Sequence, residues 1–131
     1  MKTWISKLKV RSYELDSFGH VNNGSFANYL EKARGDYLQE AGLHFDDFHR
    51  WGKYPVIAKV IIEYRAPAFF AETLSINALV KKIGNSSLTL SYQVMKDNGI
   101  LAATAETVMV FVDKEGKPTS MPDKMRDAFK V

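Results

Sequence analysis

The sequence predicts an α+β fold in which a curved antiparallel β-sheet of about five strands wraps around one long central helix. Two patterns support this prediction: one stretch with helical spacing of apolar residues, and five stretches with strand spacing. Short turns join the later strands, and such turns imply antiparallel neighbours. Because one helix has to cover the whole sheet, we expect the sheet to curl around it.

The first expected element is a strand over residues 7–13, where Leu8 and Val10 alternate with polar neighbours. Residues 14–24 are dense in residues that favour turns and in side chains that hydrogen-bond to nearby backbone. We therefore expect a loop between this strand and the next element.

The long helix is expected from Phe26 to Ala41, because its apolar residues recur at helical offsets. Asn22 or Asn23 can cap its start, and Gly42 suits the left-handed position that often follows a helix. Gly35 in mid-helix costs about 1 kcal/mol relative to alanine, which suggests close packing by another element.

Four further strands are expected over residues 56–64, 73–83, 87–96 and 100–112. The first of them is almost entirely apolar, so we expect it to be covered on at least one face and tightly packed. Residues 43–54 are interpreted as a variable stretch, and residues 123–129 as one or two helical turns.

Length and composition limit the functional classes. The 131 residues suit a single domain, 1–131, and the net charge of +3 comes from scattered Lys and Arg, which argues against nucleic-acid binding. The absence of cysteine excludes disulfides, thiolate metal sites and a cysteine nucleophile. No signal peptide or membrane span is recognisable, so we expect a cytoplasmic protein that does not bind membranes.

The loop before the helix is the candidate active site. A helix start offers unpaired N–H groups and the positive end of the helix dipole. We expect the amides of Asn23, Gly24 and Ser25 to polarise a carbonyl, and Asp16 to attack it or to deprotonate a water. His20 and Asn22 could orient the water or contact the substrate. An activated ester such as a thioester suits this chemistry.

Simpler interpretations stand beside these. An aspartate in such a turn most often makes an Asx-turn or a cap, His20 alone is more often structural, and paired asparagines often only cap. The segment His44–His49 has no standard zinc spacing, so we predict no metal. Basic and polar residues near the third strand's end could meet phosphates, although a solvated turn explains them as well: Lys81, Lys82 and Ser86.

Two motifs read as a unit resemble a known family. The stretch Tyr13–Asn23 (YELDSFGHVNN), followed by Tyr29-x-Glu31-x-Ala33-Arg34, resembles the 4-hydroxybenzoyl-CoA thioesterase-like group of hotdog-fold enzymes. It is also similar to acyl-acyl-carrier-protein thioesterases. Residues 63–68 and 121–126 resemble family segments too, so the likeness covers nearly the whole chain.

The resemblance implies a hotdog fold and a homodimer or homotetramer with active sites between subunits. It implies that Asp16 is the nucleophile or general base, that the amides from Asn23 to Ser25 polarise the carbonyl, and that no cofactor is needed. Asn23 departs from members with a histidine there, and Ala71-Glu72 replaces the Gly-Asp of many relatives. Phosphate contacts are assigned to Arg65, Lys81, Lys82 and Ser86.

The leading functional prediction is therefore hydrolysis of an acyl-CoA to a carboxylic acid and a free thiol. An acyl-carrier-protein substrate is an alternative, and the mild positive charge suits either partner because both are acidic. Two other classes are a hotdog module that binds acyl thioesters without cleaving them, and a dehydratase, which the lack of a histidine at the helix start disfavours.

Overall fold

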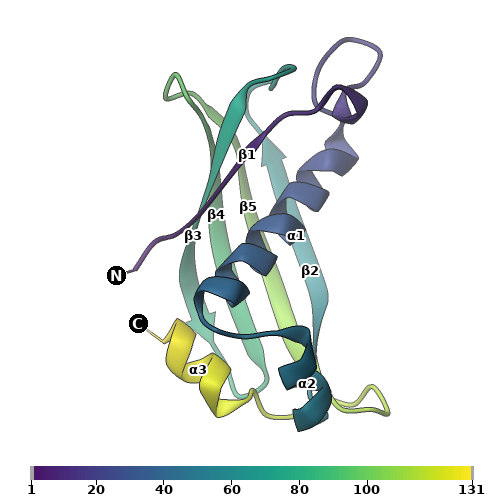
Figure 1. Ribbon diagram of the computed structural model, residues 1–131, viewed down its shortest axis with the longest axis vertical. Helices are drawn as coiled ribbons and strands as arrows, with labels where there is room; N and C mark the ends of the chain where they lie inside the picture. The colour runs from purple at the N-terminus through teal and green to yellow at the C-terminus, as the bar shows by residue number, and fades with distance from the viewer. Residues whose placement is uncertain (1, 131) are drawn as a thin grey trace.

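A computed structural model describes residues 2–130 (Figure 1). Three helices and five strands follow one another in the order β1 (Trp4–Lys9), α1 (Asn23–Glu40), α2 (Phe45–Trp51), β2 (Tyr54–Tyr64), β3 (Thr73–Ile83), β4 (Ser87–Lys96), β5 (Leu101–Val112) and α3 (Asp123–Phe129). The strands form one antiparallel sheet in the order β1-β3-β4-β5-β2. None of the described helices combines the length and apolar character needed to cross a membrane.

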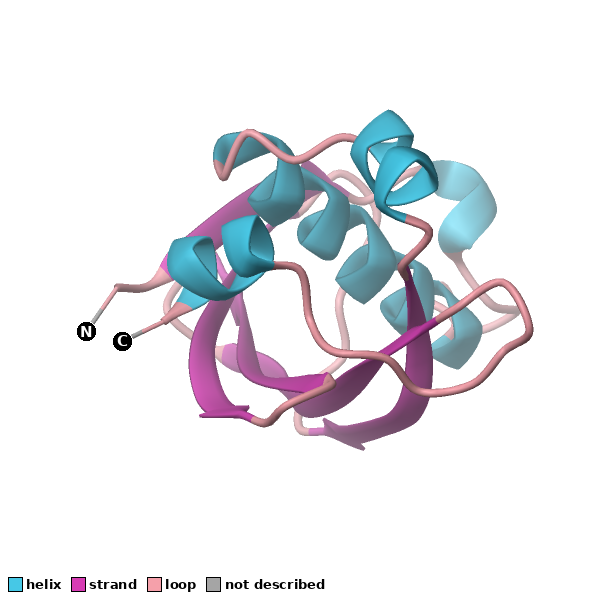
Figure 2. Cartoon of the chain, turned by 90° about the horizontal axis from the view of Figure 1, so that it is seen from below, coloured by secondary structure: helices cyan, strands magenta, loops and turns pink. Residues whose placement is uncertain are grey.

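The sheet curves around α1, as predicted (Figure 2). The helix buries one stripe of apolar side chains, Phe26, Tyr29, Leu30, Ala33 and Tyr37, against the concave face of the sheet. The Tyr37 hydroxyl donates to the carbonyl of Ile76, 2.6 Å away, which satisfies a polar atom deep in the core.

Polar contacts hold α1 on the β1 side of the sheet. Lys32 donates to the carbonyl of Lys7 at 3.1 Å and to the carboxylate of Asp36 at 2.6 Å. Asp36 in turn accepts from the hydroxyl of Ser6 in β1. The helix therefore packs mainly over β1 and β3.

One expected boundary was wrong, and one helix lies in a stretch for which no element was predicted. The first strand ends at Lys9 rather than residue 13, because residues 12–14 form a 3-10 turn that Glu14 closes by accepting from the Arg11 amide at 2.8 Å. The stretch at 43–54 contains α2, which is too short to show a helical repeat. It is stabilised by its ends: Asp47 accepts from the His44 amide at 2.9 Å, and Gly52 adopts a left-handed φ of 64°.

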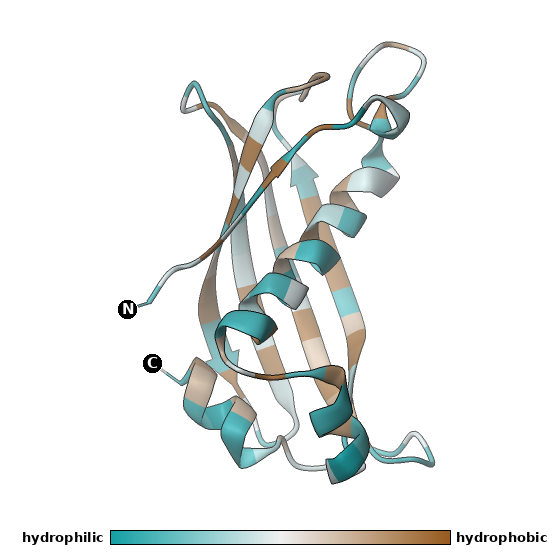
Figure 3. Ribbon diagram, viewed as in Figure 1, coloured by the Kyte–Doolittle hydropathy of each residue, from teal (hydrophilic) through white to brown (hydrophobic). Residues whose placement is uncertain are grey.

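Residues 56–64 belong to a strand, as expected, but the expectation that this strand is covered on at least one face was wrong. The strand exists, but its apolar side chains are exposed on both faces within one chain: Val56, Ile57, Val60, Ile61 and Tyr64. Figure 3 shows how much of β2 is apolar. The reason is the position of α1, which packs mainly over β1 and β3 and meets β2 near its end at Tyr64, while α2 contacts the beginning of β2.

Candidate active site

A tight loop brings Asp16 to the start of α1. The Asp16 amide donates to the carbonyl of His20 at 2.7 Å, and the Gly19 amide donates back to the carbonyl of Asp16 at 3.1 Å. Gly19 has a φ of 79°, a backbone conformation that is costly for residues with a Cβ. The loop therefore folds back on itself and holds Asp16 and His20 side by side.

The two carboxylate oxygens of Asp16 have different environments. Oδ1 accepts from the amides of Phe18 at 2.9 Å and His20 at 3.1 Å, which is the Asx-turn of the simpler interpretation. Among residues 2–130, no group donates to Oδ2, and the residue is exposed. One oxygen thus fixes the loop, while the other is available to a substrate or a water.

The start of α1 leaves one amide open. Asn22 is the N-cap, and its Oδ1 accepts from the Gly24 amide at 2.7 Å. The Ser25 amide donates to the Asn22 carbonyl at 2.9 Å. The Asn23 amide has no acceptor within the described part of the chain, so it is the free N–H among the three expected donors.

A cavity of about 290 Å³ joins these groups. Asp16, His20 and Asn23 line it together with aromatic and basic side chains, Phe26, Tyr64 and Arg65. The Tyr64 hydroxyl donates to the carbonyl of Asn23 at 3.2 Å, and its ring meets Phe26 edge-on at 5.3 Å. The cavity therefore combines an open carboxylate oxygen, an open amide and an aromatic wall.

Glu14 anchors the loop from below, a feature that the sequence analysis missed. Its buried carboxylate accepts from the Arg11 amide, from the Arg11 guanidinium at 2.9 Å and from the Tyr29 hydroxyl at 2.9 Å. Its carbonyl accepts from the Asn22 amide at 2.8 Å. Glu14 thus ties the segment before Asp16 to the N-cap and the second turn of α1.

These contacts shift two pKa values. Burial alone would raise the pKa of Glu14, but the hydrogen bonds from Arg11 and Tyr29 outweigh it and hold this pKa below its ordinary value. Burial and the neighbouring Glu14 carboxylate raise the pKa of Tyr29, which keeps its hydroxyl a donor. The signal in the sequence was only the acidic residue two places before Asp16.

The other expected phosphate contacts lie elsewhere in the chain. Lys81 and Lys82 line a separate cavity with Arg126 and Lys130, and Ser86 lies in the turn after β3. This turn is at the opposite end of the sheet from the start of α1 (Figure 1). Of the expected set, only Arg65 lines the Asp16 cavity.

Ala71 and Glu72, which replace the Gly-Asp of many relatives, still form an ordered loop between β2 and β3. Ala71 has a φ of 67°, and it is the only described residue other than glycine with a positive φ. Its amide donates to the carbonyl of Val10 at 3.1 Å, and Glu72 pairs with Lys96 at 3.2 Å. The loop also places Phe69 edge-on to the His20 ring at 5.2 Å, so it supports the site from behind.

No group of three potential metal ligands is found among residues 2–130. His44, Asp46 and Asp47 belong to the beginning of α2, where Asp47 serves as the capping acceptor and pairs with Arg50. Their structural roles account for this acidic and histidine-rich segment.

Comparisons with known proteins point to one family. A family model described as the thioesterase-like superfamily matches residues 10–129. The long-chain acyl-CoA thioesterase FadM of Escherichia coli is 31% identical over 93% of this chain and 93% of its own length. The acyl-acyl carrier protein thioesterase ATL3 of Arabidopsis thaliana is 27% identical, and the match covers 94% of this chain but only 65% of ATL3. A solved structure of a hypothetical protein from Aquifex aeolicus superposes with a TM-score of 0.89 at 28% identity, covering 96% and 98% of the two chains.

Proposed function

This chain belongs to the thioesterase-like superfamily and has its hotdog fold, and from that premise we propose that it hydrolyses acyl-CoA thioesters in the Asp16 cavity. The observation that carries the proposal is the pairing of an open carboxylate oxygen with an open helix-start amide in one cavity. A relative named as a long-chain acyl-CoA thioesterase supports the substrate class.

The proposed reaction places the thioester carbonyl between Asp16 and the Asn23 amide. Oδ2 of Asp16 either attacks the carbonyl carbon or removes a proton from the water that attacks it. Negative charge then develops on the carbonyl oxygen, where the Asn23 N–H and the positive end of the α1 dipole stabilise it. Collapse of this intermediate expels the thiolate. In the water route the carboxylic acid forms at once, and Asp16 returns to the thiolate the proton that it took from the water. In the attack route the thiolate takes a proton from solvent, the acyl group stays on Asp16 as a mixed anhydride, and a water molecule then hydrolyses this anhydride to the carboxylic acid and restores the carboxylate.

Neighbouring residues supply orientation. Asn22 and Gly24 keep the helix start capped, and in this proposal the open Asn23 amide beside the cavity is the donor to the carbonyl. His20, held against Phe69, lies beside Asp16 and contacts the attacking water or the leaving sulfur in this proposal. Arg65 is exposed at the cavity and offers a cation to the phosphates of CoA.

We infer in addition that the chain forms a homodimer through β2. This strand hydrogen-bonds only to β5, so its other edge carries unpaired backbone groups. Its apolar side chains are exposed on both faces, and charged residues along it are few, Lys59 and Glu63. Antiparallel pairing with the same edge of a second copy satisfies the backbone and buries both faces.

The experiment that tests the function follows free thiol release from acyl-CoAs of different chain lengths. We expect Asp16→Asn to lower kcat by roughly a hundredfold or more, because the amide is neither a nucleophile nor a base. Asp113→Asn is a matched control: Asp113 also accepts from the amides two and four residues later, at 2.9 and 3.0 Å, but in a turn that does not line the cavity.

Two results would contradict the proposal. One is equal activity of Asp16→Asn and the wild type, which would remove Asp16 from the chemistry. The other is tight binding of acyl-CoA without turnover, which would favour the binding module. Turnover of acyl-carrier-protein but not acyl-CoA would keep the chemistry and change the substrate.

A further inference from the structure

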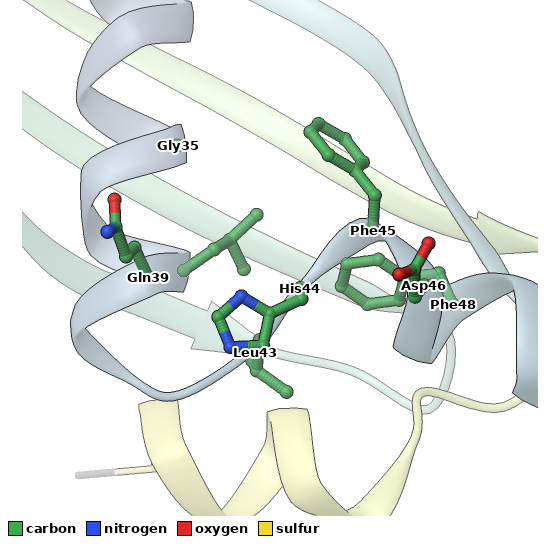
Figure 4. Close-up of a pocket in the computed structure, with 8 residues that line it drawn as sticks. Gly35, Gln39, Leu43, His44, Phe45, Asp46 and Phe48 are labelled. Carbon is green, nitrogen blue, oxygen red and sulfur yellow. The ribbon is translucent and has the colours of Figure 1, made fainter.

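A second cavity, of about 410 Å³, lies at the other end of α1 (Figure 4). Most of its lining is apolar, from Leu38, Leu43, Phe45 and Phe48, and Gly35 forms part of the wall on α1. Phe45 is 81% exposed, and its ring points away from α2 toward the space beside α1 (Figure 4). An apolar ligand in this cavity would remove that ring from water.

At Gly35 the wall of this cavity carries no side chain. A glycine in mid-helix costs about 1 kcal/mol relative to alanine. A Cβ built on Gly35 would meet no atom within 4 Å, so packing inside this chain does not require the glycine. Its absence of a side chain therefore leaves room for something that is not part of this chain.

The proposed dimer brings this cavity to the active site of the other subunit. The Asp16 cavity lies at the end of β2 that carries Tyr64, and the hydroxyl of Tyr64 contacts Asn23. The second cavity lies at the Tyr54 end, where His49 of α2 meets the Tyr54 ring edge-on at 5.4 Å. Antiparallel pairing about a two-fold axis sets the Tyr64 end of one copy opposite the Tyr54 end of the other.

We propose that the Gly35 cavity of one subunit receives the acyl chain of the thioester whose carbonyl lies at Asp16 of the other subunit. The inference rests on the proposed function and on the β2 dimer. It names the substrate class as thioesters with an extended apolar acyl chain. Short acyl groups end before the cavity and gain nothing from it.

The first test compares myristoyl-CoA with butyryl-CoA. Gly35→Leu fills the cavity. We expect the ratio of kcat/KM for the long substrate to kcat/KM for the short one to fall about tenfold or more, because losing the contact of one methylene with an apolar pocket lowers kcat/KM by about tenfold. Glu40→Leu adds the same side chain to an exposed position of α1 that lines neither cavity, and the ratio should stay that of the wild type.

The second test asks whether the cavity acts across the dimer. Mixed dimers of one Asp16→Asn chain and one Gly35→Leu chain, purified by two different tags, contain one intact combination of carboxylate and cavity. We expect about half of the wild-type myristoyl-CoA activity from them. If carboxylate and cavity had to come from the same chain, mixed dimers would be no better than the average of the two parent variants.

The outcomes separate the inference from the function on which it rests. An unchanged ratio in Gly35→Leu, or no recovery in mixed dimers, overturns the inference while thioester hydrolysis stands. If Gly35→Leu changes the mass of the oligomer but not the ratio of kcat/KM for the two substrates, the open space serves subunit packing, and the inference is also overturned. Failure of the wild type to cleave any thioester removes the proposed function itself.

Discussion

Asp16 divides two tasks between its two oxygens. Oδ1 holds the loop by accepting two amides, and Oδ2 stays open to the cavity. In the proposed reaction a carboxylate fixed in this way loses little conformational freedom, which is the benefit of preorganisation. The Asx-turn and the proposed catalytic role are therefore compatible, because each uses a different atom of the same side chain.

Glu14 is the residue on which this arrangement depends most. We expect Glu14→Gln to lower the free energy of unfolding by about 1–2 kcal/mol at pH 7, because it weakens the charge-assisted hydrogen bonds from Arg11. Urea unfolding measures this change. Glu115→Gln, in an exposed turn, is the control and should change stability very little.

The difference in unfolding free energy between the wild type and Glu14→Gln should depend on pH in a definite direction. The pKa of Glu14 is lower in the folded protein than its ordinary value of 4.5. The charged carboxylate therefore stabilises the fold above that value, and this contribution is lost as the pH falls through the folded pKa. The gap between wild type and Glu14→Gln should narrow below about pH 4.5. An equal gap at pH 7 and pH 3.5 would rule out the charge as its cause.

At the scale of elements, the long patterns were predictable. The helical spacing of α1 and the alternation in β3 and β4 gave those elements close to their observed bounds. The short ones were not, because α2 is held by its ends rather than by a repeating apolar face. In the site, Asp16 and Asn22 could be identified from the motif, but the choice of Asn23 as the open amide depends on hydrogen bonds made only in the folded loop.

The loop between β2 and β3 carries a strain that one substitution can relieve. Ala71 holds a φ of 67°, a region that costs an L-residue roughly 1–2 kcal/mol. We expect Ala71→Gly to raise the free energy of unfolding by about 0.5–1 kcal/mol, after the greater flexibility of glycine in the unfolded chain is subtracted. Differential scanning calorimetry measures the gain as a higher Tm.

A matched alanine in the same region checks the cause. Ala66 lies in the same loop without a positive φ, so Ala66→Gly should lower the Tm through flexibility alone. A lower Tm for both variants would mean that the left-handed backbone at Ala71 costs less than the flexibility that glycine adds.

At the scale of the whole molecule, the two edges of the sheet differ. Along β1 the exposed positions include Lys7 and Lys9, charged residues of the kind that protect an edge from pairing. The other edge, β2, exposes Val60 toward the concave face and Ile61 toward the convex face. An apolar strand has the same sequence pattern whether its own chain or a second copy covers it, which is why the sequence alone could not show that β2 is open.

This asymmetry predicts which edge holds two chains together. The chain has a mass of 14.8 kDa, so we expect light scattering after size exclusion to give about 30 kDa, or twice that if dimers pair into tetramers. Ile61→Lys places a charge in the middle of the β2 contact and should shift the mass toward one chain. Ile5→Lys makes the same change on β1, where Ile5 is 55% exposed, and should leave the mass unchanged.

Because the acyl cavity is proposed to act across this contact, Ile61→Lys should also lose the preference for myristoyl-CoA over butyryl-CoA. A wild type of one-chain mass, or dissociation by Ile5→Lys instead, would place the contact elsewhere and with it the two-fold arrangement of the sites.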